Sequence, residues 1–161
     1  MLPEQTLRDA ETLLDACRAK GIRLATAESC TGGLIAAALT AVAGSSDVFD
    51  RSFVTYSNDA KHQMIGVPSG LIETQGAVSE DVARAMASGA LERSRAGIAV
   101  AVTGVAGPGG GTDAKPVGLV CFGIAERGQP TVSEQRVFPG DRTSIRAATV
   151  AHAFGLIRAR V

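Results

Sequence analysis

Apolar side chains recur along the chain with two different periods, and these periods predict a regular succession of helices and strands. Residues 4–20 carry apolar side chains at helical spacing, and Gly21 ends the repeat. The same reasoning predicts helices at 31–42, from 57–59 onward, and at 69–75, 78–94 and 142–160. Short apolar runs predict strands at 22–27, 53–56, 97–103, 119–125 and 131–138.

The order of these elements predicts the fold. The run at 97–103 is apolar throughout its middle, which is typical of a central strand buried on both faces. The turn at 128–130 predicts an antiparallel hairpin of the last two strands. Alternating strands and helices therefore indicate an α/β fold, a three-layer α/β/α sandwich with a mixed, mostly parallel sheet. A length of 161 residues suits one domain, so we expect residues 1–161 to form a single domain.

One stretch, residues 25–33, combines a strand end, a polar turn and a helix start. Its sequence is Ala-Thr-Ala-Glu-Ser-Cys-Thr-Gly-Gly. Unpaired N–H groups at the start of the following helix, with glycines that allow close approach, favour an anion such as a phosphate or an oxyanion. The stretch has neither P-loop nor Gly-x-Gly-x-x-Gly spacing. The plainer alternative is an ordinary connection in which Ser29 or Thr31 caps the helix.

A second glycine-bearing loop, residues 103–112, follows the predicted central strand. A flexible linker is one interpretation, but the loop returns directly into another apolar run, which favours the wall of a binding site. Both loops follow strand ends, so we expect them to converge on one cleft.

Composition and charge exclude several classes of partner. The formal net charge is zero and no long basic run is present, which argues against nucleic-acid binding. No apolar stretch reaches the roughly 18 residues that span a bilayer, so we expect no membrane partner. The N-terminus lacks the pattern of a signal peptide, and the three cysteines are typical of reduced thiols, so we expect a cytoplasmic protein.

The supply of titratable side chains limits the chemistry. There are two histidines and no cluster of metal-ligand residues, so we expect neither a metal site nor a cofactor. His152 fits a packed position in the last helix, and a serine nucleophile would therefore depend on a lysine base. Lys61 is the candidate, because the first turn of a helix disfavours a cation. The alternative for Lys61 is a solvated surface side chain.

Six motifs follow one another along the chain. They are Thr26–Gly33, Ala43–Ser46, Val54–Asn58 with Lys61, Gly76–Ser79, Thr103–Pro108 and Lys115–Gly118. Together they resemble the CinA C-terminal-domain family, in the stand-alone form similar to the PncC-type nicotinamide-nucleotide amidases, from about residue 5 to the C-terminus. We find no counterpart of the N-terminal molybdopterin-binding-like domain of longer members in this sequence, so we expect no activity of that domain.

The resemblance implies hydrolysis of the carboxamide of nicotinamide mononucleotide (NMN) to nicotinate mononucleotide and ammonia, in pyridine-nucleotide salvage. A metal-independent mechanism needs a serine nucleophile and a neutral lysine base, and burial with the nearby helix start would lower the pKa of Lys61. We expect Tyr56 to assist Lys61. The nucleophile stays open between Ser46, which we slightly prefer, and Ser29. Cys30 is discounted because a residue between two turn hydroxyls can equally point into the core.

The remaining expectations concern substrate and partners. An alternative function is a non-catalytic nucleotide sensor or regulatory module that uses the same pocket. The alanine-rich helices favour a homodimer, although packing within one chain explains them equally well. The residues expected to bind substrate are Thr31, Gly32, Gly33, Thr103, Gly104, Gly107 and Arg142.

Overall fold

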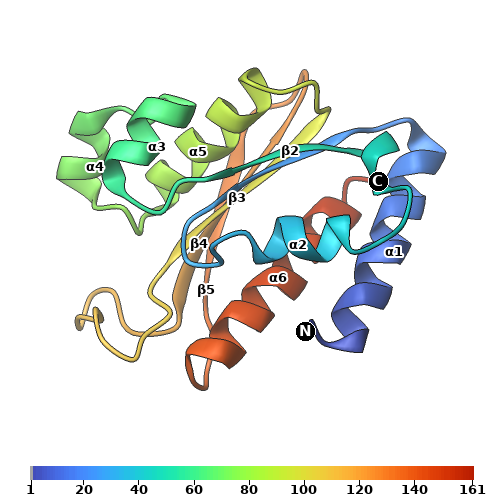
Figure 1. The fold of residues 1–161 in the computed structure, drawn as a ribbon. Coiled ribbons are helices and arrows are strands. Elements are labelled where there is room, and N and C mark those ends of the chain that lie inside the picture. Colours follow the sequence, from blue (N-terminus) through green and yellow to red (C-terminus); the bar gives the residue numbers. More distant parts are fainter. Residues whose placement is uncertain (1) are drawn as a thin grey trace.

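The computed structural model describes residues 2–161, which form a sheet covered by helices on both faces (Figure 1). The six helices and the 3₁₀ turn are α1 (Glu4–Lys20), α2 (Leu34–Thr40), η1 (Ser45–Asp47), α3 (Asn58–Ile65), α4 (Ser69–Gln75), α5 (Glu80–Glu92) and α6 (Arg142–Arg158). The strands are β1 (Leu24–Glu28), β2 (Phe49–Val54), β3 (Ile98–Gly104), β4 (Leu119–Glu126) and β5 (Val132–Val137).

The sheet has the strand order β2-β1-β3-β4-β5. β1 pairs in parallel with β2 and β3, whereas β4 runs antiparallel to both β3 and β5. The strands β2, β1, β3 and β5 therefore point the same way. This arrangement confirms the mixed, mostly parallel sheet and the C-terminal hairpin.

The two faces of the sheet carry side chains of different size, because successive residues of a strand point to opposite faces. The face toward α1, α2 and α6 carries large side chains: Leu24, Ile98, Val100, Val102, Val120, Phe122 and Ile124. The face toward α3, α4 and α5 carries small ones: Ala25, Ala27, Ala99, Ala101 and Ala125. Small side chains let α5 lie close to the sheet, and a Cβ added at Gly123 of β4 would meet the carbonyl oxygen of Ala83 at 2.1 Å.

Most predicted helices are confirmed, and α3 and α6 each begin at a capping side chain. The hydroxyl of Ser57 accepts from the N–H of Ala60, and Asp141 accepts from the N–H of Ser144. No helix among residues 2–161 has the length and apolar character needed to cross a membrane.

The strand β2 begins at Phe49, four residues before the predicted start. Its early part, Asp50 and Arg51, is polar because β2 is an edge strand with partly exposed side chains. Hydrophobic periodicity therefore detected only the apolar end of this strand.

Candidate active site

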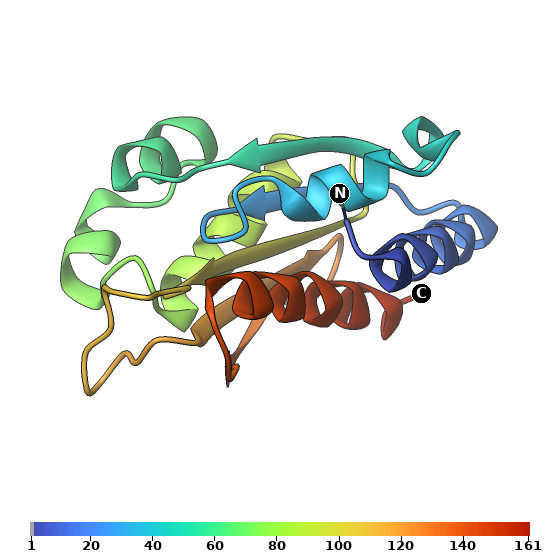
Figure 2. The same cartoon turned by 60° about the horizontal axis from the view of Figure 1, so that its bottom comes forward.

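A lysine and a serine meet at the carboxyl end of the parallel strands. Nζ of Lys61, from α3, lies 3.0 Å from Oγ of Ser29, which directly follows β1. The same Nζ donates to the carbonyl oxygen of Thr55, at 2.9 Å, just after β2. In Figures 1 and 2 the turn after β1, the loop after β3, α3 and the start of α6 lie at one end of the sheet. This end is the expected position for a site in such a fold.

Lys61 is buried, with 2% of its surface exposed. Desolvation by burial lowers the pKa of its ammonium group. Among the described residues it has no carboxylate within salt-bridge distance to oppose that effect. The solvated-surface interpretation of Lys61 is therefore wrong, and its amine is suited to accept a proton.

Strand alternation explains why Ser29 faces the lysine. Ala25 and Ala27 point toward the side of the sheet covered by α3 and α5, and Ser29 continues that series. The N–H of Ser29 donates to the carbonyl oxygen of Val102 at 3.1 Å, which prolongs the pairing of β1 with β3. The serine is thus fixed by the sheet as well as by its turn.

Glu28 points to the opposite face and occupies the start of α2. Its fully buried carboxylate accepts from the N–H groups of Gly33, Ile35 and Ala36 at 3.0, 3.1 and 2.8 Å, and from the hydroxyl of Thr31 at 2.6 Å. The expectation that this helix start receives an anion from the substrate is wrong, because an internal carboxylate already takes its donors.

Of the turn residues predicted to bind substrate, Thr31 is the one whose side chain is committed within the protein, whereas Gly32 is exposed and Gly33 is partly exposed. Thr31 is fully buried, and its hydroxyl is committed to Glu28. Gly32 and Gly33 have φ of +58° and +100°, so they serve the turn conformation. These residues shape the support of Ser29.

Ser46 lies away from the lysine. It belongs to η1, before the amino end of β2, and its backbone carbonyl accepts from Arg23. Lys61 lies beyond the opposite end of β2, and six residues of strand separate the two ends by roughly 20 Å. The expected pairing of Ser46 with Lys61 is therefore wrong within this chain, and Ser29 takes the position beside Lys61.

Tyr56, Gly107 and Arg142 lie together at the mouth of the site. The guanidinium of Arg142 donates to the hydroxyl of Tyr56 at 3.2 Å and to the carbonyl oxygen of Gly107 at 2.9 Å. Tyr56 is 63% exposed, so its ring is available to a ligand. Next to them is a hollow of about 460 Å³, lined by Ala106, Pro108, Val117, Gly140, Asp141, Arg142 and Thr143.

Two other predicted binding residues lie at the end of β3, where Thr103 is buried and Gly104 is partly exposed. The hydroxyl of buried Thr103 donates to the carbonyl oxygen of Ala77 at 2.8 Å. A Cβ at Gly104 would meet the carbonyl oxygen of Leu119 at 2.8 Å. Thr103 and Gly104 therefore hold the base of the loop, whereas Gly107 lies beside Arg142.

The other nucleophilic and ligand-type side chains are accounted for by packing. Cys30 belongs to the core beside α6, and burial raises the pKa of its thiol to about 11. His152 packs against Phe122, with ring centroids 4.6 Å apart, as predicted. Residues 2–161 contain no group of three or more His, Cys, Asp or Glu side chains that could hold a metal ion.

Sequence reasoning missed Glu28, Thr55 and Arg146. Arg146 of α6 donates to the carbonyl oxygens of Cys30 and Thr31, at 3.1 and 2.9 Å. An acidic residue at the end of an otherwise apolar strand was an available signal for Glu28. The carbonyl of Thr55 and the reach of Arg146 had no local signal, because both depend on tertiary contacts.

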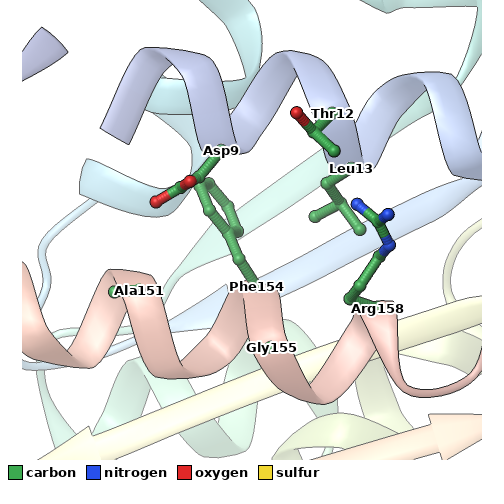
Figure 3. Close-up of a pocket in the computed structure, with 7 residues that line it drawn as sticks. All are labelled: Asp9, Thr12, Leu13, Ala151, Phe154, Gly155 and Arg158. Atoms are coloured by element: carbon green, nitrogen blue, oxygen red, sulfur yellow. The ribbon is translucent and has the colours of Figure 1, made fainter. Parts of the chain in front are cut away.

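A separate groove of about 210 Å³ lies between α1 and α6 (Figure 3). It contains none of the predicted site residues. Its lining residues are Asp9, Thr12, Leu13, Ala151, Phe154, Gly155 and Arg158.

Comparison with known proteins places this geometry in context. The family model described as CinA C-terminal domain matches residues 7–161. Nicotinamide-nucleotide amidohydrolase PncC from Enterobacter agglomerans is 52% identical over 81% of this chain and 80% of that protein. A CinA-like protein from Akkermansia muciniphila is 54% identical over 86% of this chain.

The likeness extends to solved structures and differs in extent among relatives. The crystal structure of competence/damage inducible protein CihA from Agrobacterium tumefaciens superimposes with a TM-score of 0.94, at 49% identity, covering 99% of this chain and 97% of that chain. By contrast, the chain spans only 33% to 38% of the length of several CinA-like and competence-damage inducible relatives.

Proposed function

Because the chain belongs to the CinA C-terminal domain family, we propose that it is a nicotinamide-nucleotide amidase, which hydrolyses NMN to nicotinate mononucleotide and ammonia. The name of the PncC relative, which matches most of both chains, supports this activity. The observation that carries the proposal is the contact of 3.0 Å between buried Lys61 and Ser29. A serine beside a neutral amine is a recognised arrangement for acyl transfer.

The proposed first step is attack of Oγ of Ser29 on the carboxamide carbon while Nζ of Lys61 takes the hydroxyl proton. A neutral lysine amine has two N–H donors and one lone pair. One N–H donates to the carbonyl of Thr55, which leaves the lone pair for the hydroxyl of Ser29. The tetrahedral oxyanion is assigned to the turn that directly follows Ser29, where the N–H of Cys30 has no backbone acceptor within residues 2–161.

The proposed second half returns the enzyme to its starting state. The protonated Lys61 gives its proton to the leaving nitrogen, the C–N bond breaks, and ammonia departs from an acyl-Ser29 ester. Lys61 then takes a proton from water, whose oxygen attacks the ester carbonyl. Breakage of the ester bond returns the proton to Oγ of Ser29 and releases nicotinate mononucleotide.

The phosphate of NMN is proposed to bind beside Arg142. This guanidinium uses two of its five donors on Tyr56 and Gly107, so donors remain for an anion. The adjoining hollow at the start of α6 has room for a ribose phosphate. Because Glu28 fills the start of α2, the phosphate is assigned here and not to that helix.

The test is ammonia release by the purified protein from NMN, with nicotinamide and NAD in parallel and EDTA present. The proposal expects release from NMN alone, unaffected by EDTA. Tight binding of NMN by calorimetry without release from any substrate would instead support the nucleotide-sensor function. Release from nicotinamide at the same rate would contradict a role for the phosphate.

A further inference from the structure

We infer that Glu28 is a positioning residue, which acts together with Arg146 to fix the turn that aims Ser29 at Lys61. The kinetic part of this inference rests on the proposed function. Glu28 and Arg146 both act through residues 30–36, and their hydrogen-bond partners do not include the hydroxyl of Ser29 or the amine of Lys61.

Glu28 satisfies more donors than an ordinary helix cap. A capping side chain usually accepts from one backbone N–H of the first turn. Here one carboxylate accepts from three, at Gly33, Ile35 and Ala36, and from the hydroxyl of Thr31. Burying a charge is costly unless it is fully hydrogen-bonded, so this set of donors is what allows a carboxylate with no exposed surface. The same donors tie the turn and α2 to the end of β1.

Arg146 binds the same turn through the carbonyl oxygens of the turn. Its Nε and Nη2 donate to the carbonyl oxygens of Cys30 and Thr31. The backbone after Ser29 is therefore fixed from two sides. Its N–H groups at Gly33, Ile35 and Ala36 donate to Glu28 of β1, and its carbonyl oxygens at Cys30 and Thr31 accept from Arg146 of α6. A displacement of the reacting atoms by about 1 Å can lower a rate about 100-fold, so this two-sided support has a direct kinetic consequence.

The variant Glu28→Gln keeps the size of the side chain but removes its negative charge and one of its two acceptor oxygens. The amide keeps the size of the carboxylate, but one terminal atom becomes an NH₂ donor. The hydroxyls of Thr26 and Ser52 lie 3.4 Å from Oε1 and can accept from that NH₂. The NH₂ then takes the place of Oε1, so the N–H of Ala36 loses its hydrogen-bond acceptor. The link between the end of β1 and the first turn of α2 is weakened as a result.

The experiment measures the rate at which a small fluorophosphonate modifies Ser29, together with kcat and KM for NMN. For Glu28→Gln we expect modification and kcat to fall in parallel by about 10-fold to 100-fold, with KM within about 3-fold of the parent value. Circular dichroism at the assay temperature checks that the variant is folded. A folded variant that is modified at the parent rate would overturn the inference.

Two further variants keep the test decisive. Ser52→Ala removes a hydroxyl near the carboxylate that does not contact the turn, so modification of Ser29 should stay at the parent rate. If Glu28→Gln does not fold, Thr31→Val removes a single hydrogen bond to Glu28, and a fall of about 3-fold to 10-fold is expected. An unchanged rate in folded Thr31→Val would then count against the inference.

The pH profile distinguishes positioning from a direct charge effect. Because Glu28 acts through the backbone, its replacement should lower kcat at every pH and leave the midpoint of the profile in place. A shifted midpoint with unchanged modification of Ser29 would overturn the inference in favour of a charge effect on Lys61. If the parent protein is modified at Ser29 but releases no ammonia from NMN, the proposed function fails, while the modification rates still decide the role of Glu28.

Discussion

Lys61 and Ser29 are 32 positions apart in the sequence, yet Nζ of the lysine lies 3.0 Å from Oγ of the serine. The parallel pairing of β1 with β2 produces this contact, because Ser29 follows one strand and α3 follows the other. The proposed reacting pair is therefore brought together by the sheet, and each member can be tested separately.

Replacement of the two candidate serines should give opposite results. Ser29→Ala removes the hydroxyl beside Lys61 and should lower kcat for NMN by at least about 10³-fold. Ser46→Ala changes an exposed residue before the far end of β2 and should leave kcat within about 2-fold of the parent. Steady-state ammonia release measures both variants, and a large loss in Ser46→Ala alone would contradict the assignment of the nucleophile.

Replacement of Lys61 by methionine should separate activity from stability. Methionine fills the buried space without the cost of burying an amine, so the free energy of unfolding should stay equal or rise. The rate of NMN hydrolysis should fall by about 10²-fold to 10⁴-fold, the usual contribution of a general base. Urea unfolding and ammonia release measure the two effects.

The matched variant Lys61→Ala tests the burial of the same side chain by removing most of its volume. Lys61 is among the largest fully buried side chains, so alanine leaves a cavity and should be less stable than Lys61→Met by roughly 2 kcal/mol or more. Equal stability of the alanine and methionine variants would contradict the burial of this side chain.

The pH dependence of activity should show the neutral form of Lys61. Burial lowers the pKa of its ammonium group, so kcat should rise with pH around a midpoint below the ordinary lysine value of about 10.4. Lys61→Met should lack this rise in its residual activity. A parent midpoint at or above the ordinary value would contradict a lysine base.

The same pKa shift predicts the direction of a stability change. Between the lowered pKa of the folded state and that of the unfolded chain, the unfolded chain binds more protons at Lys61. Its contribution to the free energy of unfolding therefore rises with pH across this interval and is constant below it. The difference between the parent and Lys61→Met, measured by urea unfolding against pH, isolates this contribution.

Arg142 should affect binding more than chemistry. Arg142→Lys keeps a positive charge but loses the fork that spans Tyr56 and Gly107. We expect KM for NMN to rise about 10-fold with a smaller change in kcat, because the group is proposed to hold the phosphate. Initial rates over a range of NMN concentrations measure this split, and an equal loss of kcat with constant KM would instead place Arg142 in the chemical step.

The sequence was most informative for features that depend only on neighbouring residues in the chain. Helical periodicity located α1 and α4 closely, and the cation in the first turn of a helix singled out Lys61. Both features are local, and local features can be read without knowing the strand order.

The choice between Ser29 and Ser46 was not local. Both residues lie in polar turns with neighbouring glycines, and only the position of each turn at one or the other end of the sheet separates them. The misplaced anion site has the same origin, because the carboxylate that fills the start of α2 comes from the preceding strand. Periodicity predicts which way a strand residue faces, but not which donors it meets there.

The position of β2 at the edge of the sheet has a consequence for how the protein fails on heating. β2 has a hydrogen-bonded neighbour on one side only, and Thr55, just after its end, holds the amine of Lys61. Edge elements open at a lower free energy than the inner strands of a sheet. We expect fraying of this strand to separate the two proposed reacting groups while the inner strands stay intact, so that activity is lost below the cooperative melting transition. The working temperature would then be limited by local opening of β2, which amide hydrogen exchange measures, and not by Tm.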